Sequence, residues 1–166
     1  LVGSEMCIRD SPDPDIAFAK SQVSAFNPLP TEGKVFISVN DRDKDRVLHM
    51  ARQLADMGFT LCATRGTMIH LLQHDIECER AYKVNEARRP NIVDHIKNGD
   101  IDFIINTPGS HDARADDIII RSSAIAAKTS YCTNLASAQA CVNAIEALKN
   151  KNLQVCTIQE YHAQNL

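Results

Sequence analysis

The chain has 166 residues, of which 44% are hydrophobic, and a formal net charge of −3 at pH 7. This length favours one domain with a real hydrophobic core. The slightly negative charge gives no reason to expect a nucleic acid or an anionic membrane as partner. No apolar run approaches the ~18 to 20 residues that a membrane span needs.

The first eleven residues, LVGSEMCIRDS, have no periodicity and lack the apolar core of a signal peptide. We treat residues 1–11 as a non-native head and exclude them from fold reasoning. The chain contains no C-x-x-C pair, and several of its cysteines lie in apolar runs. We therefore expect free, inert thiols that pack as small hydrophobic side chains. These features predict a cytoplasmic protein. The six cysteines are Cys7, Cys62, Cys78, Cys132, Cys141 and Cys156.

From residue 12 the chain shows interpretable patterns. The stretch IAFAKSQVSAF, residues 16–26, has apolar positions near helical spacing and is predicted to be a helix. The stretch NPLPTEG that follows contains two prolines and a glycine and is predicted to be a linker.

After Gly33, short apolar runs alternate with amphipathic stretches. This alternation predicts an α/β, Rossmann-like three-layer sandwich with a mostly parallel five-stranded sheet. The predicted strands are 34–39, 59–63, 80–84, 101–106 and 129–133, with 153–158 as one further candidate. The predicted helices are 43–58, 67–74, 90–99 (opened by Pro90), 112–128 and 134–150.

Polar residues follow four of the predicted strands, at the sheet edge where ligands of such folds bind. Lysine binds phosphate as a point charge, and hydroxyls and glycine-exposed amides are neutral donors. Each loop alone is typical of turn chemistry, but their convergence predicts a site for a phosphorylated small molecule. The candidate residues are Ser38, Lys44, Thr64, Gly66, Thr67, Lys83, Val84, Asn106 and Thr107.

Two other groups are given structural interpretations. His70 and His74 have the spacing of a metal pair, but no third ligand is placed, so we predict an ordinary helix surface. Asp112, Asp116 and Asp117 are interpreted as caps and charges at the start of a helix. The chain contains no G-x-G-x-x-G, P-loop or G-x-S-x-G motif.

Several separated motifs carry a family resemblance: VFISVNDRDK, GFTLCATRGT, KVNEARRPNIVDHIKNGDIDFIINT and VCTIQEYHAQ. In order and spacing they resemble the C-terminal, methylglyoxal-synthase-like domain of the carbamoyl-phosphate synthase large subunit. PDPDIAFAKSQVSAFNPLPTEG resembles the segment that joins this domain to the synthetase body. The resemblance divides the chain into the head 1–11, a connecting helix and linker 12–33, and a methylglyoxal-synthase-like allosteric domain 34–166.

The resemblance implies a regulatory domain that binds nucleotide monophosphates, UMP as inhibitor and IMP as activator. Such binding controls carbamoyl phosphate synthesis for the pyrimidine and arginine pathways. The family's pattern can carry a second hydroxyl after Asn-Thr, where this chain has Pro108, which loses a side-chain donor and a backbone N–H. Thr107 and Ser110 are the candidates to compensate. The family's nucleotide-site residues match Ser38, Lys44, Thr64, Thr67, Lys83, Val84 and Asn106.

The resemblance also implies that this fragment has no catalytic activity and no cofactor of its own. The full-length parent is an ATP-dependent, glutamine-hydrolysing ligase that uses Mg or Mn. The implied partners are the synthetase domains of the parent large subunit, the glutaminase small subunit and further copies in a homo-oligomer.

Two alternatives remain open. A methylglyoxal synthase-like lyase acting on dihydroxyacetone phosphate has this fold, but its chemistry needs a carboxylate base, which the family supplies from an aspartate in a G-G-D loop. Here the loop reads EARRPN, residues 86–91. Arginine stays protonated and cannot be the base, which leaves Glu86 as the candidate base.

The second alternative is a pure oligomerisation module that uses the exposed faces of the last helices.

Overall fold

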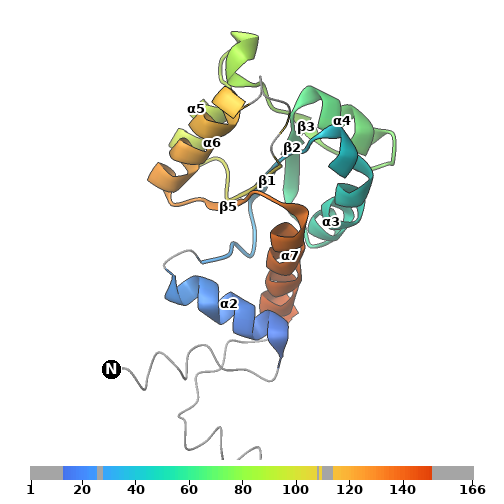
Figure 1. The fold of residues 1–166 in the computed structure, drawn as a ribbon. Helices are drawn as coiled ribbons and strands as arrows, with labels where there is room; N and C mark the ends of the chain where they lie inside the picture. Colours follow the sequence, from blue (N-terminus) through green and yellow to red (C-terminus); the bar gives the residue numbers. More distant parts are fainter. Residues whose placement is uncertain (1–12, 26–27, 108, 110–113, 151–166) are drawn as a thin grey trace, which may run out of the picture.

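The computed structural model describes residues 13–25, 28–107, 109 and 114–150 (Figure 1). The head 1–11, the candidate strand 153–158, Pro108, Ser110 and Asp112 lie outside these residues. None of the described helices is long and apolar enough to cross a membrane.

Five parallel strands form one sheet in the order β3-β2-β1-β4-β5. The chain therefore runs outward from the central strand β1 to the edge strand β3, and then returns to the other side of β1. This confirms the predicted α/β, Rossmann-like architecture. The strands are β1 Lys34–Ser38, β2 Thr60–Ala63, β3 Glu79–Arg80, β4 Phe103–Asn106 and β5 Ser130–Cys132.

Helices cover both faces of the sheet (Figure 1). Helices α3, α4 and α7 contribute to the core on one face, and α5 and α6 contribute to the core on the other. The helices are α2 Pro14–Ser24, α3 Lys44–Asp56, α4 Arg65–Leu72, α5 Ile92–Asn98, α6 Arg114–Ala127 and α7 Leu135–Asn150. Two 3-10 turns, η1 Asp41–Asp43 and η2 Val84–Glu86, follow β1 and β3.

The strand side chains alternate between these two cores. In β1, Val35 and Ile37 belong to the core of α3 and α7, whereas Phe36 belongs to the core of α5 and α6. All three side chains are fully buried. A strand buried on both faces needs an almost continuous apolar sequence, which explains the run KVFISV.

The predicted third strand, 80–84, is wrong beyond Arg80. Only Glu79 and Arg80 pair with β2. The backbone then leaves the sheet, because the Tyr82 carbonyl accepts a hydrogen bond from the Ile92 amide at 2.9 Å and Lys83 caps the turn η2. Residues 81–84, predicted as strand, therefore lie outside β3.

Three helices begin two residues away from the predicted start: α2, which begins at Pro14 and not at residue 16, α4 and α5. Helix α4 begins at Arg65 because Thr64 is the extended residue before it. Helix α5 begins at Ile92 and not at Pro90, because Asn91 and Asp94 form a capping box. The Asn91 Oδ1 atom accepts hydrogen bonds from the first turn, and the Asp94 carboxylate accepts one from the Asn91 amide at 2.9 Å.

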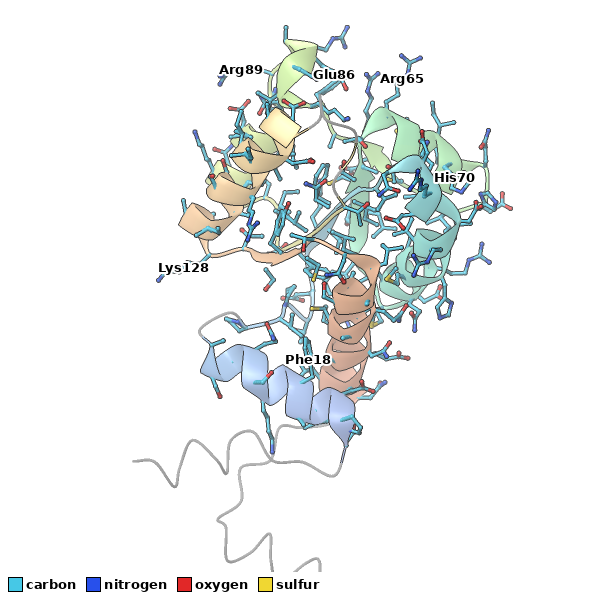
Figure 2. All side chains as sticks on the ribbon, viewed as in Figure 1. Phe18, Arg65, His70, Glu86, Arg89 and Lys128 are labelled. Atoms are coloured by element: carbon cyan, nitrogen blue, oxygen red, sulfur yellow. The ribbon has the colours of Figure 1, made fainter. Side chains whose placement is uncertain are left out.

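The connecting helix α2 packs against α7 (Figure 1). Ile16 and Ala19 are buried, and Phe18 packs against the same core as α7 (Figure 2). The helix is capped by Asp13, whose Oδ1 atom accepts a hydrogen bond from the Asp15 amide at 3.0 Å. This helix therefore belongs to the hydrophobic core of the described structure.

Candidate anion-binding site

A pocket of about 270 Å³ lies beyond the carboxyl ends of the strands, between the ends of β1 and β4. This is the point at which the strand order reverses, and open α/β sheets bind ligands at such points. Four of the residues predicted from the strand ends line it together. The lining residues are Ser38, Val39, Asn40, Asp41, Thr64, Lys83, Thr107, Gly109 and Asp117.

Three predicted threonines hold the loop that follows β1. The Val39 amide donates to the Thr67 Oγ1 atom at 3.3 Å, and the Asn40 amide donates to the Thr107 Oγ1 atom at 3.0 Å. The Thr64 hydroxyl donates to the Thr67 Oγ1 atom at 3.4 Å. All three threonines are buried, so their first role is to fix the shape of the pocket wall.

Lys44 brings a positive charge to the start of α4. A Cβ atom built on Gly66 would lie 3.5 Å from the Lys44 Nζ atom, so the ammonium group lies over the glycine of the Thr-x-Gly-Thr loop. The same Nζ atom contacts the Asp41 carboxylate at 2.7 Å. This hydrogen bond lowers the pKa of Asp41, whose side chain is 91% exposed. Because exposed ion pairs contribute little to stability, the Asp41 carboxylate holds the Lys44 ammonium group only weakly.

Lys83 and Val84 lie at the end of β3, where the chain leaves the sheet. Lys83 lines the pocket and is half-buried. Val84 instead packs against the core that α5 and α6 share with the sheet. The structure therefore brings the lysine to the pocket and uses the valine to anchor the turn η2.

Asn106 lies behind the pocket wall. Its side chain is 2% exposed, and its Nδ2 atom donates to the Asp117 carboxylate at 3.1 Å and to the Tyr131 hydroxyl at 2.9 Å. Burial raises the pKa of Tyr131, and the hydrogen bond from Asn106 opposes this rise. Asn106 thus reaches the pocket through Asp117, which lines it.

Sequence reasoning missed the pocket role of Asp117 and of the residues directly after β1. Asp117 lies in the first turn of α6, as predicted, but it also faces the pocket across the sheet edge. No local signal marks this contact, because it depends on how α6 crosses the end of β4. Asn40 and Asp41 had a signal, since they directly follow β1 at the edge where ligands bind.

Glu86, the candidate base of a lyase, is held outside the pocket. Its Oε2 atom accepts a hydrogen bond from Arg80 at 2.8 Å, and it is not among the residues that line the pocket. Arg89 in the same loop pairs with Asp94 at 2.9 Å, and Figure 2 shows Glu86 and Arg89 at the outer end of this loop. This loop therefore presents no free carboxylate to the pocket.

His70 has a structural contact on the surface between two helices. Its Nε2 atom lies 3.0 Å from the Asp45 carboxylate and so links α4 to α3. The His74 Nδ1 atom lies 2.8 Å from the His70 carbonyl. In the part of the chain that the structure describes, no group of three or more His, Cys, Asp and Glu residues is arranged to hold a metal ion.

Comparison with known families defines the class of protein. Residues 46–133 match the family model described as "MGS-like domain". The chain therefore belongs to the MGS-like domain family. Among solved structures it is similar to the methylglyoxal synthase from Elizabethkingia anophelis NUHP1, with a TM-score of 0.56 over 69% of this chain and 79% of that one. The sequence identity is 18%, so this likeness concerns the fold alone.

Curated relatives narrow the comparison further. The chain is 48% identical over 147 residues to the carbamoyl phosphate synthase large chain, C-terminal section, of Methanopyrus kandleri. It is 42% identical to the carbamoyl phosphate synthase large chains of Archaeoglobus fulgidus, over 151 residues, and of Campylobacter jejuni, over 146 residues. These matches cover 87% to 90% of this chain but only 27%, 14% and 13% of the relatives, so the chain corresponds to a small part of each.

Proposed function

We propose that this chain is a nucleotide-binding regulatory domain of a carbamoyl phosphate synthase large chain. The observation that carries the proposal is the pocket at the carboxyl edge of the sheet, where Ser38, Thr64, Lys83 and Thr107 converge from four strand ends. Its hydroxyls and Lys83, together with Lys44, which contacts the lining residue Asp41, are suited to a phosphorylated ligand. The similarity to carbamoyl phosphate synthase large chains supports a place for this domain within such an enzyme.

The proposed roles follow from the position of each group. Lys44 and the amides at the start of α4 hold the phosphate, because a helix N-terminus and an ammonium group both favour an anion there. Lys83 contacts the phosphate or the ribose. Asn106 orients Asp117, whose carboxylate is an acceptor for ribose hydroxyls at the pocket wall.

The remaining candidates have supporting roles. Thr67 and Thr107 keep the loop after β1 in place, and Ser38 lines the pocket beside them. UMP and IMP are the proposed ligands. Such a ligand regulates only if it binds two conformations of the enzyme unequally, and a typical coupling is ~1 to 3 kcal/mol.

The proposed partners are the other domains of the same enzyme. They are the synthetase domains of the large chain, the glutaminase small subunit and further copies of the large chain in a homo-oligomer. In this proposal ATP and Mg or Mn serve those synthetase domains, and the chain described here contributes binding and no catalysis. The much greater length of the curated relatives supports a place within a larger enzyme.

Calorimetric titration of the chain with UMP and with IMP tests this function. Inorganic phosphate and dihydroxyacetone phosphate serve as comparison ligands, and methylglyoxal is assayed in the last cell. We expect at least one nucleotide to bind more tightly than inorganic phosphate, with no methylglyoxal formed. Methylglyoxal production would replace the proposal with a lyase, and a chain that binds neither nucleotide would leave oligomerisation as the surviving role.

A further inference from the structure

Two cysteines lie in contact between the edge strand β5 and the helix α7. Cys132 is the last residue of β5, and Cys141 lies within α7. Their Sγ atoms are 3.5 Å apart, and both residues are 5% exposed. The sequence predicted inert thiols, but this contact sets the two residues apart.

The surroundings of Cys132 favour its thiolate. The contact with the Cys141 thiol lowers the pKa of Cys132, burial opposes this effect, and the nearby Ser137 hydroxyl adds a smaller lowering. Helix α7, sixteen residues long, begins three positions after Cys132, and the positive end of a helix dipole stabilises a nearby thiolate. Donation to Cys132 raises the pKa of Cys141. The Cys132 sulfur is thus suited to be the nucleophile, and the Cys141 sulfur is suited to remain a thiol.

The pair also lies close to the protein surface. Thr133 and Asn134, which connect β5 to α7, are both exposed. Cys132 is therefore adjacent in the chain to two exposed residues, which favours access of a small oxidant from that side. A disulfide needs an S–S distance of ~2.05 Å, so the two sulfurs must approach by roughly 1.5 Å.

Cys62 and Cys78 provide a contrast within the same chain. Burial raises the pKa of each thiol to about 12. Cys62, like Cys132, lies three positions before the start of a helix, so the helix start alone does not set Cys132 apart. What distinguishes Cys132 is its contact with the Cys141 sulfur at 3.5 Å and the lowered pKa that accompanies it. A thiol with a raised pKa is a poor nucleophile at neutral pH.

We propose that Cys132 and Cys141 form a redox-active dithiol, which a hydroperoxide converts into an intramolecular disulfide. The Cys132 thiolate attacks the terminal peroxide oxygen, the O–O bond breaks, and Cys132 becomes a sulfenic acid while the leaving oxygen takes a proton. The Cys141 sulfur then attacks the Cys132 sulfur and displaces water. With hydrogen peroxide, two thiols lose two electrons and two protons, and the peroxide becomes two molecules of water.

The sequence makes this disulfide easy to detect. Residues 129–149 form a single tryptic peptide that carries both cysteines, because no Lys or Arg lies between Lys128 and Lys149. The experiment uses the full chain with Cys7→Ser and Cys156→Ser, treated with hydrogen peroxide while folded, then denatured and alkylated. The peptide is expected to lose ~2 Da, for two hydrogens, and to take up no alkyl group. Treatment with a dithiol reductant before alkylation restores two alkylation sites.

The control is internal, because Cys62 and Cys78 lie in separate tryptic peptides of the same digest. Both are expected to stay fully alkylated under conditions that oxidise the 129–149 peptide. Equal loss of alkylation at Cys62 and Cys78 would overturn the proposal, because it would show general oxidation. An unchanged 129–149 peptide would overturn it as well and leave a simple S–H···S contact in the core.

Single variants test which sulfur reacts first. With Cys141→Ser, the Cys132 sulfenic acid has no thiol to resolve it and is expected to be trapped by dimedone. With Cys132→Ser, Cys141 is expected to remain a thiol that takes up an alkyl group. Trapping at Cys141 in place of Cys132 would contradict the proposed order of attack.

Discussion

Two hollows at opposite ends of β2 differ in size and in chemistry. The hollow at the start of the strand is the larger, about 510 Å³, and the pocket at its end is about 270 Å³. The larger hollow is lined mainly by apolar residues and by two glutamates, whereas the smaller one gathers hydroxyls, a lysine and two aspartates. Its lining residues are Ala55, Phe59, Thr60, Leu61, Leu72, Glu77, Cys78 and Glu79.

This difference shows that volume does not identify an anion site. At the larger hollow, the lining residue Glu79 pairs with Lys34 at 2.7 Å, and Glu77 adds a further negative charge. At the smaller pocket, Lys44 makes an ion pair of the same length with Asp41, but its ammonium group also lies over the first turn of α4. A helix N-terminus and the buried threonines around it distinguish the two ends of the strand.

The largest expected effect is on ligand affinity. Lys44→Ala should weaken nucleotide binding by ~1.5 to 3 kcal/mol, or about 10- to 150-fold, because it removes a charged hydrogen bond to the phosphate. Titration calorimetry with UMP and IMP measures this change.

The matched control for that variant is Lys34→Ala, which removes the lysine of the other ion pair. It should leave nucleotide affinity unchanged. A comparable loss of affinity in both variants would show that the two lysines act only through the overall charge of the domain.

The next effect is on stability. Thr107→Val removes the acceptor of the Asn40 amide hydrogen bond and should lower the free energy of unfolding by ~0.5 to 1.5 kcal/mol, because a part-buried hydrogen bond is lost. Urea denaturation measures this change. Thr60→Val, at the exposed start of β2, is the control and should change stability by less than ~0.5 kcal/mol. If both variants lower the free energy of unfolding equally, the proposed role of Thr107 in stabilising the pocket wall is wrong.

The smallest expected effect concerns the carboxylate that competes for Lys44. Asp41→Asn should strengthen nucleotide binding by about two- to fivefold, because the phosphate no longer has to displace an exposed carboxylate. Glu79→Gln removes the corresponding partner of Lys34 and should have no effect on binding. Weaker binding by the Asp41→Asn variant would mean that Asp41 itself contacts the ligand.

Local sequence patterns predicted the strands and helices that carry strong signals. The apolar run IDFIIN contains β4, and the helix that ends at Gly99 is α5. The third strand was predicted to be too long because a tertiary contact ends it. The Ile92 amide donates a hydrogen bond to the Tyr82 carbonyl, which holds the chain away from the sheet. Such a contact joins residues ten positions apart and leaves no local signal.

The candidate site shows the same limit. Position after a strand was enough to select Ser38, Thr64, Lys83 and Thr107, because parallel strands bring their carboxyl ends to one edge. It was not enough to place Asn106 behind Asp117, since that arrangement depends on the packing of α6 against β4 and β5. Which threonines hold the loop after β1 and which line the pocket also depends on tertiary packing.

Amide chemical-shift mapping during a nucleotide titration tests the central claim most directly. In 1H–15N spectra of the chain with UMP or IMP, we expect the largest shifts at the amides of Val39, Asn40, Gly66, Thr67 and Thr107. The amides of Thr60, Leu61 and Glu79, at the larger hollow, should stay in place. Shifts concentrated at the larger hollow, with none at the Thr-x-Gly-Thr loop, would contradict the assignment of the carboxyl-end pocket as the nucleotide site.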